Sequence, residues 1–398
     1  MSLRIVISAG EVSGDRHLSK AVAALKAAHP DCQLRGMAGR ECEQAGAELL
    51  VDCYRSGATM GFAEIFKSLS KIISSFRVMS KLIREWKPDV VVLTDYPDFN
   101  MRLAKVAHRA GCKVVYFIPP KAWAWRPGRV ELIKRYVTQV AAIFPFEKKF
   151  YADRGYSRVT YVGNPLGENV TSEPVDRSNT LLMLPGSRKF EVELILPPML
   201  RVFERIRRDR PALRGRIIAA PNMSTETLGT LVRANVSADT VESLSWTHGD
   251  ALEEMRHARA GILKSGTCNL EGAVAGLPFV SVYSGSWVSK VITWALVRLK
   301  EYSPVNIMRS GTVREVFGVH IDEDDLERAV IQILDDGVGR DSSIAGLAEV
   351  RAMLTGFDIP AGMKREGTSA ERLAYVITSV AQGENDARVN ERQGAEKA

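Results

Sequence analysis

The sequence predicts an α/β protein made of two Rossmann-like domains that face a cleft. Residues 4–15 contain an apolar strand (RIVISA) and a glycine-bearing loop (GEVSGD), and residues 17–28 follow with the apolar spacing of a helix. Residues 181–191 repeat this order, because an apolar run stops at Pro185-Gly186 and a helical pattern begins near Glu191. Each half therefore opens with a strand, a glycine turn and a helix, as nucleotide-binding domains do.

The first half contains apolar, β-branched runs at the spacing of alternating strands and helices. They are residues 4–9, 89–94, 113–118, 140–144 and 158–162. Runs of this kind without polar alternation indicate a parallel sheet that is covered on both faces.

The second half repeats the scheme after a polar segment, 167–179, which we interpret as a linker. Its expected strands are residues 180–184, 216–220, 260–264 and 278–283. We expect an N-terminal domain over 1–168, a C-terminal domain over 176–349, a segment at 350–380 that packs back on the first domain, and a disordered tail at 382–398.

Composition and charge limit the classes of partner and cofactor that the protein can have. The 398 residues carry a net charge of +7, with a pI of about 9.1, which suits phosphate-bearing substrates or an anionic membrane surface. No zinc-finger or aromatic RNA-binding motif is present, so we expect no nucleic-acid partner. The five cysteines are scattered without metal-ligand spacing and suit a reducing compartment, so we expect no metal. No apolar run is long enough to predict a membrane span.

The segment 184–191 (LPGSRKFE) predicts a place to hold a diphosphate. Gly186 and Ser187 offer backbone N–H groups at the start of a helix, and Arg188 adds a planar set of donors. The alternative is an ordinary strand-turn-helix corner with a solvated arginine.

Two further segments carry polar groups just past buried strands. Asp95 and Asp98 follow the strand that ends at Thr94, where a carboxylate can accept a proton from a sugar hydroxyl. The alternative is that Asp98 caps a helix starting about Asn100.

Residues 264–271 (KSGTCNLE) place hydroxyls and N–H groups at another helix start. They come from Ser265, Gly266 and Thr267, and Glu271 lies one turn further, where its carboxylate can accept from ribose hydroxyls. The alternative is a plain cap with a surface glutamate. Asn306 follows a proline turn near the same end of the sheet.

Residues 60–86 have apolar side chains at helical spacing, interleaved with Lys67, Lys71, Arg77, Lys81 and Arg84. One interpretation is a helix packed on the core. The other is a peripheral membrane patch over residues 60–76, with lysines on lipid phosphates. The apolar members would be Phe62, Ile65, Phe66, Leu69, Ile72, Ile73 and Leu194, aided by Ile195 and Leu196. Two tryptophans in residues 119–129 (PPKAWAWRPGR) suit either core or interface.

Taken together, these segments resemble the lipid-A-disaccharide synthase family of glycosyltransferases. The resemblance runs from about residue 4 to residue 310, with the motifs in the family's order and spacing. They are SAGEVSGD (8–15), MGFAEIF (60–66), DYPDFN (95–100), WAW (123–125), PFEKKFY (145–151), GNPL (163–166), LPGSR with its glutamate (184–191) and SGTCNLE (265–271).

The resemblance implies a GT-B fold and an inverting sugar transfer without metal or cofactor. The implied donor is a UDP-2,3-diacylglucosamine, and the implied acceptor is 2,3-diacylglucosamine 1-phosphate (lipid X). The family's essential Asp and Arg correspond to Asp98 and Arg188. Its uridine-diphosphate contacts correspond to the 265–267 turn, Glu271 and Asn306.

The same resemblance assigns an acceptor side and a location. The acceptor-side residues are Ser13, Gly14, Asp15, Asp95, Lys121 and Asn164. The protein is expected in the cytoplasm, peripheral on the inner face of the inner membrane, and a homodimer is one assembly to test.

The chain departs from the family pattern at three places. It has Pro119-Pro120-Lys121 where the family usually has Ser-Pro-Ser, Asn164 where it has His, and Pro304-Val305 where it has Leu-Pro. A paralogue acting on another UDP-sugar or lipid acceptor, or an epimerase-like enzyme of the same fold, is therefore the alternative. A dinucleotide oxidoreductase is disfavoured because residues 10–15 lack GxGxxG.

Overall fold

The structure is a computed structural model. It describes residues 2–53, 62–124, 126–170, 177–219, 223–284, 301–360, 362–363 and 366–383; for residues 62–69 it describes the backbone alone. The chain divides into two compact units, residues 1–165 with 356–398 and residues 166–355. Gln382 and Gly383 end a helix, and the remainder of the predicted tail lies outside the described residues.

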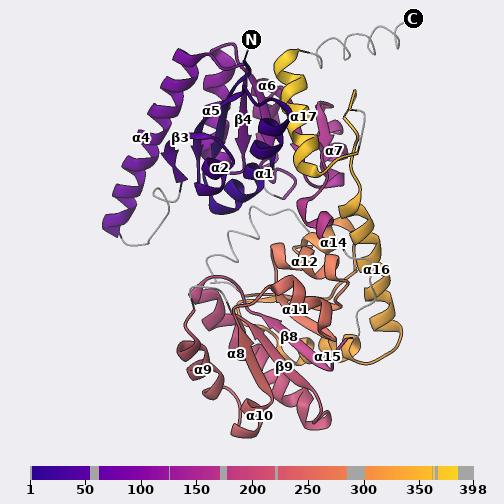
Figure 1. Ribbon diagram of the computed structural model, residues 1–398. Helices are drawn as coiled ribbons and strands as arrows, with labels where there is room; N and C mark the ends of the chain where they lie inside the picture. Colours follow the sequence, from indigo (N-terminus) through magenta and orange to yellow (C-terminus); the bar gives the residue numbers. More distant parts are fainter. Residues whose placement is uncertain are drawn as a thin grey trace, which may run out of the picture. The chain divides into compact units, whose positions relative to one another are not determined.

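Unit 1 is a parallel sheet in the order β3-β2-β1-β4-β5-β6-β7 (Figure 1). Its strands are β1 (Arg4–Ala9), β2 (Gln33–Ala38), β3 (Glu48–Asp52), β4 (Val90–Thr94), β5 (Lys113–Phe117), β6 (Gln139–Ala142) and β7 (Val159–Tyr161). Its helices are α1 (Val12–Ala28), α2 (Arg40–Gln44), α4 (Phe62–Trp86), α5 (Pro97–Arg109), α6 (Arg129–Tyr136), α7 (Pro145–Ala152) and α17 (Ser369–Gln382). The prediction of a parallel sheet is confirmed, and β2 and β3 are strands that the sequence did not predict.

Helices cover both faces of this sheet, which explains the continuous apolar runs. Successive residues of a strand point to opposite faces. In β4, Val91 and Leu93 join the core beneath α4 and α5, while Val90 and Val92 join the core beneath α1 and α17. Gly36 in β2 is required by a close approach, because a Cβ there would collide with the carbonyl of Ile7 on the neighbouring strand.

The last helix, α17, completes unit 1 from the far end of the chain. It packs against α1, and its Leu373, Val376 and Ile377 lie in the core. Figure 1 shows α17 in yellow beside the indigo α1. Arg372 fixes the helix start, since its Nε donates to the carbonyl of Val162 at 2.7 Å and its guanidinium stacks 3.7 Å from the Phe357 ring.

Unit 2 is a second parallel sheet, in the order β10-β9-β8-β11-β12-β13. Its strands are β8 (Thr180–Leu184), β9 (Arg214–Ile218), β10 (Leu244–Thr247), β11 (Ala260–Lys264), β12 (Phe279–Ser284) and β13 (Glu315–Gly318). Its helices are α8 (Lys189–Asp209), α9 (Thr225–Arg233), α10 (Ala238–Glu242), α11 (Ala251–His257), α12 (Thr267–Ala275), α14 (Pro304–Met308), α15 (Glu323–Leu334) and α16 (Val338–Thr355), and a short 3₁₀ turn covers Pro165–Asn169. Strands β10 and β13 were not predicted from the sequence.

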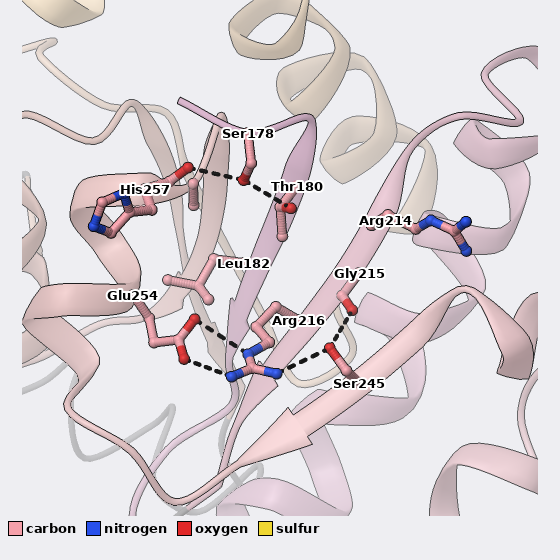
Figure 2. Close-up of a pocket in the computed structure, with 10 residues that line it drawn as sticks. Ser178, Thr180, Leu182, Arg214, Gly215, Arg216, Ser245, Glu254 and His257 are labelled. Atoms are coloured by element: carbon pink, nitrogen blue, oxygen red, sulfur yellow. Dashed lines mark hydrogen bonds and ion pairs between the residues drawn. The ribbon is translucent and has the colours of Figure 1, made fainter. Parts of the chain in front are cut away.

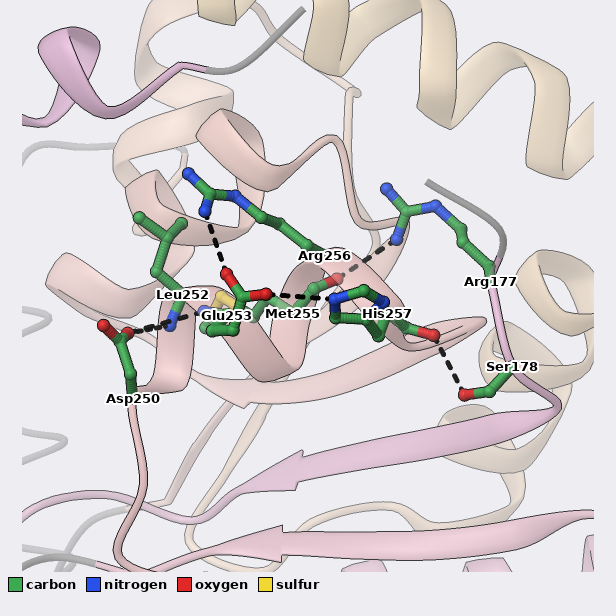
Figure 3. A network of polar contacts seen from close by, with 8 residues as sticks. All are labelled: Arg177, Ser178, Asp250, Leu252, Glu253, Met255, Arg256 and His257. Atoms are coloured by element: carbon green, nitrogen blue, oxygen red, sulfur yellow. Dashed lines mark hydrogen bonds and ion pairs between the residues drawn. The ribbon is translucent and has the colours of Figure 1, made fainter. Parts of the chain in front are cut away.

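Arg177, within the predicted linker, is anchored to two helix ends of unit 2. Its Nη1 donates to the carbonyls of Met255 and Ala258, at 3.1 and 2.8 Å. Its Nη2 donates to the carbonyls of Ala275 and Gly276, at 2.7 and 3.0 Å. A cation suits these positions, because the last carbonyls of a helix are unpaired and carry partial negative charge. Figure 3 shows Arg177 reaching the end of α11, beside the Ser178 bond to the carbonyl of His257.

A buried carboxyl group fixes the loop after β5. The indole Nε1 of Trp123 donates to Oε1 of Glu147 at 3.2 Å, and the N–H of Phe144 donates to Oε2 at 3.2 Å. Trp123 also packs edge-on against Phe146, with ring centroids 5.1 Å apart. Burial raises the pKa of Glu147 to about 7, although these donors and the charge of Lys121 act in the opposite direction.

The raised pKa predicts a pH-dependent stability. The folded state binds the Glu147 proton more tightly than the unfolded state, so this stabilisation is complete below about pH 4.5 and is lost as the pH rises to about 7. We expect the wild type to lose about 3 kcal/mol more than Glu147→Gln between about pH 5 and about pH 8. Urea unfolding of both proteins at the two pH values measures this, and parallel pH profiles would contradict it.

Candidate active site

The strand order of unit 1 places the predicted acceptor-side loops next to each other. The chain leaves β1 toward β2 on one side and returns to β4 on the other, so a crevice opens at the carboxyl ends of β1 and β4. Ser13 and Gly14 follow β1, and Asp95 and Asp98 follow β4. These predicted residues therefore meet at one edge of the sheet.

Asn100 joins the two strand ends at this edge. It is fully buried, and its Nδ2 donates to the carbonyls of Ser8, Thr94 and Asp95, at 3.3, 3.1 and 2.8 Å. Its Oδ1 accepts from the Ser8 hydroxyl at 2.7 Å. One side chain thus anchors the start of α5 to the ends of β1 and β4, which the sheet already pairs. Asn100 was not among the predicted site residues, although it closes the DYPDFN motif.

The bend between β4 and α5 is held in a costly backbone conformation. Asp95 and Tyr96 both have φ of 47°, in the left-handed region that non-glycine residues rarely occupy. The bend is stabilised by Asn100 and by the Tyr116 hydroxyl, which donates to the Asp95 carbonyl at 3.0 Å. Gly10 leaves room for the Tyr96 ring, which a Cβ at that position would strike. Burial raises the pKa of the Asp95 carboxyl, against the N–H of Tyr96 and the charge of Lys121.

Asp98 lies in the first turn of α5, with its side chain exposed. Arg129 donates from Nη2 to Oδ1 of Asp98 at 2.6 Å, and Arg126 lies 3.7 Å from the same oxygen. Arg129 is itself only 8% exposed, so it holds the carboxylate from a fixed position. Helix α5 begins at Pro97, before Asp98, and the Asp98 side chain makes an ion pair in place of the cap that we had considered.

Three other acceptor-side residues have different surroundings. Asp15 is buried and accepts from the backbone N–H groups of Gly39, Glu41 and Cys42, so it holds the start of α2. Asn164 is buried and donates to the carbonyl of Ile143 at 3.1 Å. Lys121 is exposed in the loop after β5.

In unit 2 the equivalent crevice lies between β8 and β11. The chain leaves β8 toward β9 and later returns to β11 on the other side. Gly186, Ser187 and Arg188 follow β8, and Ser265, Gly266 and Thr267 follow β11. The predicted diphosphate loop and the predicted hydroxyl-rich turn are thus neighbours at the carboxyl edge of the sheet.

Glu191 organises this edge. Its Oε2 accepts from the N–H groups of Ser187 and Arg188, at 3.2 and 3.3 Å, and its Oε1 lies 3.1 Å from Nζ of Lys264. Burial opposes the charge of Glu191, but Lys264 and the two N–H groups lower its pKa overall. Gly186, with φ of 126°, admits this carboxylate, since a Cβ would lie 2.6 Å from Oε2.

This arrangement changes the predicted role of the 186–188 backbone. Two of the N–H groups that we expected at a diphosphate already bind Glu191. The Arg188 side chain remains largely exposed, 69% by area, with Nη1 3.5 Å from Oε1 of Glu191. The anion-binding capacity of this loop therefore lies mainly in the arginine side chain.

The turn after β11 is open to a ligand. Thr267 is exposed at the first position of α12, and a Cβ at Gly266 would meet no atom of the described residues within 4 Å. Ser265 is half-buried and donates to the Tyr302 carbonyl at 3.5 Å. Burial, reinforced by Asp250, raises the pKa of the Glu271 carboxyl.

Asn306 is buried and held by internal hydrogen bonds. Its Nδ2 donates to the Val313 carbonyl and to Glu315, at 2.9 and 2.8 Å, and its Oδ1 accepts from the N–H of Val313 at 3.0 Å. The predicted contact of Asn306 with a nucleotide stays a prediction.

A cavity of about 250 Å³ in unit 2 is separate from this edge (Figure 2). Its lining includes Thr180 and Arg214, the first residues of β8 and β9, so it lies at the amino edge of the sheet. Arg216 inside it makes a two-point ion pair with Glu254, at 2.6 and 3.1 Å. The cavity is part of the packing between the sheet and α11, away from the predicted donor residues.

The predicted membrane patch is described only in part. Ile72 packs partly buried on the core of unit 1, Ile73 is 44% exposed and Leu194 on α8 is 38% exposed. Ile195 and Leu196 are fully buried in unit 2, so including them was wrong. The side chains of Phe62, Ile65, Phe66 and Leu69 lie outside the described residues. No helix in the described part of the chain is long and apolar enough to cross a membrane.

Solved structures share this two-sheet architecture at low sequence identity. The calicheamicin glycosyltransferase CalG4 aligns with a TM-score of 0.60 at 14% identity, covering 95% of this chain and 98% of that one. MurG of Acinetobacter baumannii aligns with a TM-score of 0.56 at 14% identity, covering 95% and 99%. The fold is that of GT-B glycosyltransferases, as predicted.

Sequence comparison identifies the family. The family profile described as lipid-A-disaccharide synthetase matches residues 5–343. Lipid-A-disaccharide synthase of Koribacter versatilis is 33% identical over 96% of this chain and 99% of its own length. The Myxococcus xanthus enzyme of the same name is 34% identical over 88% and 93%. The chain belongs to the lipid-A-disaccharide synthase family, the glycosyltransferases of lipid A biosynthesis.

Proposed function

We propose that this protein transfers a 2,3-diacylglucosamine unit from UDP to the 6-hydroxyl of lipid X. The products are a lipid A disaccharide 1-phosphate and UDP, and the anomeric configuration is inverted. The observation that carries the proposal is Asp98, an exposed carboxylate fixed by a buried arginine at the carboxyl edge of the unit 1 sheet. Incubation with acylated UDP-sugars and lipid X, followed by product masses, tests it against another donor, another acceptor or an epimerase activity.

Asp98 acts as the general base. Its Oδ1 accepts from Arg129, and among the described residues nothing donates a hydrogen bond to its Oδ2. Oδ2 takes the proton of the 6-hydroxyl as the hydroxyl oxygen attacks the anomeric carbon, and the bond to the UDP oxygen breaks. Ser13, Gly14, Asp15, Asp95, Lys121 and Asn164 form the acceptor side, with Asp15 and Asn164 supporting its loops.

Arg188 stabilises the charge that develops on UDP as it leaves. A guanidinium suits a diphosphate because its donors lie in one plane and it stays charged. Gly186 and Ser187 shape the loop, and the Ser265, Gly266 and Thr267 turn offers hydroxyls and N–H groups to the diphosphate. Glu271 accepts from the ribose hydroxyls, and Asn306 completes the donor side. This proposal requires neither metal nor cofactor.

The substrates carry acyl chains, so the enzyme must reach them at a membrane. We propose that Phe62, Ile65, Phe66, Leu69, Ile72, Ile73 and Leu194 form a peripheral patch on the inner face of the cytoplasmic membrane. Apolar side chains in the acyl boundary and nearby lysines on anionic lipids together give reversible attachment to the membrane.

The protein is also proposed to form a homodimer. Light scattering on the purified protein measures its mass and tests this assembly.

Asp98→Asn removes the base without changing side-chain size. We expect UDP binding to be retained and turnover to fall by roughly two to four orders of magnitude. Turnover is measured with UDP-diacylglucosamine and lipid X, and Asp95→Asn is the matched comparison. If Asp98→Asn keeps near-normal turnover and Asp95→Asn loses most of its turnover, Asp95 is the general base.

Arg188→Ala removes a charge-assisted contact to the diphosphate. We expect it to weaken UDP binding by about 2–3 kcal/mol and to abolish most activity. Lys189→Ala is the control, because it removes the same charge from the next, equally exposed residue. Titration calorimetry with UDP measures both, together with Glu271→Ala. If both Arg188→Ala and Glu271→Ala bind UDP with wild-type affinity, the donor site lies elsewhere in the protein.

Ile73→Ser tests the membrane patch at an exposed position. We expect it to need less detergent for solubility and to bind UDP normally, because the side chain is largely outside the core. Ile72→Ser, one residue earlier and packed partly against the core, should also lower the unfolding temperature, which separates its core contact from its share in the patch. Vesicle sedimentation measures attachment; unchanged sedimentation with a destabilised Ile73→Ser protein would assign residue 73 to the core.

A further inference from the structure

The second half of α4 contains a groove that the proposed reaction does not use. The groove has a volume of about 380 Å³. All of its lining residues come from three successive turns of α4: Phe76, Arg77, Ser80, Lys81, Arg84 and Glu85. Figure 1 shows α4 along the outside of unit 1. The groove is therefore a feature of one helix surface, with solvent beside it.

The groove is positively charged. Arg77, Lys81 and Arg84 are spaced four and three residues apart, so they lie on one side of the helix, and all are exposed. Within the described part of the chain, none of these cations has a carboxylate partner, and Glu85 is the one acidic residue of the lining. Arginines on other helices differ: on α8, Arg201 contacts Glu323 and Arg207 contacts Asp239, each at 2.6 Å.

Ser80 provides a second, independent indication of a ligand. It lies between the cations, is only 4% exposed, and its hydroxyl has no hydrogen-bond partner among the described residues. A buried hydroxyl is normally paired, so an unpaired one among groove residues is a donor awaiting an acceptor. Phe76 forms the apolar end of the groove and is fixed edge-on against Phe99, with ring centroids 5.6 Å apart.

The groove lies apart from the candidate active site along α4. The helix ends at Trp86, whose carbonyl accepts from Arg4 at the start of β1, so this half of α4 approaches the amino edge of the sheet. Asp98 and Asp95 belong to the opposite, carboxyl edge. A ligand here does not compete for the reacting groups.

We propose that this groove binds a phosphate group, with Arg77, Lys81 and Arg84 around the anion and the Ser80 hydroxyl as a direct donor. Three cations and one hydroxyl match the oxygens and charge of a phosphate ester. The phosphate belongs to the headgroup of an anionic phospholipid or to a soluble phosphate ester. The phospholipid alternative rests on the membrane attachment proposed above, because these cations belong to the same helix, whereas the binding of a phosphate group does not depend on the proposed reaction.

The test compares two charge-matched variants of the full chain. One is Arg77→Gln/Lys81→Gln/Arg84→Gln in the groove. The control is Arg102→Gln/Lys105→Gln/Arg109→Gln, which removes three exposed cations from the neighbouring α5, none of them in the groove lining. Ser80→Ala is the third variant. Probes are phosphatidylcholine vesicles with and without phosphatidylglycerol, and glycerol 3-phosphate in solution. An unchanged unfolding temperature of unit 1 verifies the fold of each variant.

We expect the groove variant to bind phosphatidylglycerol vesicles about tenfold more weakly than the α5 control, with equal binding to phosphatidylcholine alone. Ser80→Ala should lose roughly threefold, because one hydrogen bond is removed without a change in charge. If the groove variant loses only vesicle binding, the ligand is a phospholipid headgroup. If it also loses glycerol 3-phosphate binding, the groove accepts soluble phosphate esters as well. Equal losses in the groove and α5 variants, or wild-type binding by Ser80→Ala, would overturn the proposal.

Discussion

The buried Asn100, bonded to the ends of both β1 and β4, is the constraint on which the proposed acceptor side of this protein depends. The sheet pairs β1 with β4 as far as Ala9 and Thr94, and the two chain segments diverge beyond that point. One buried amide on α5 bonds to both strand ends and so fixes the chain that leaves β4. It also stabilises the left-handed turn at Asp95 and Tyr96, and that turn sets the direction in which α5 presents Asp98.

The two units solve the same geometric problem with different groups. At the crevice of unit 1 a neutral amide links α5 to the strand ends, while at the crevice of unit 2 the link is ionic, from Glu191 on α8 to Lys264 at the end of β11. In unit 2, Glu191 also accepts hydrogen bonds from the N–H groups of Ser187 and Arg188, which would otherwise be available to a bound anion. A ligand at this edge therefore meets a surface already balanced in charge, and the exposed Arg188 supplies the excess positive charge.

The sequence was sufficient for the fold class and for the central strands, because those strands are covered on both faces and consist of uninterrupted apolar residues. It was insufficient for β3, β10 and β13, which lie at sheet edges and are short, and for β2, which contains Arg35 and Gly36. The positions of Asp95 and Arg188 in loops after β4 and β8 could be predicted because strand ends are visible in the apolar pattern. The ion-pair partners Arg129 (of Asp98) and Lys264 (of Glu191) could not be predicted, because each lies far along the chain from the carboxylate that it contacts.

The position of α17 in the core of unit 1 has a consequence for biosynthesis. During translation, the strands from β1 to β7 leave the ribosome long before α17, and the face that α17 covers stays exposed while all of unit 2 is made. Unit 2 is continuous in sequence and can complete its core first, although it is the second to be synthesised. The N-terminal unit of the chain therefore completes its core last, when α17 joins α1 over Ile5, Ile7 and Val92.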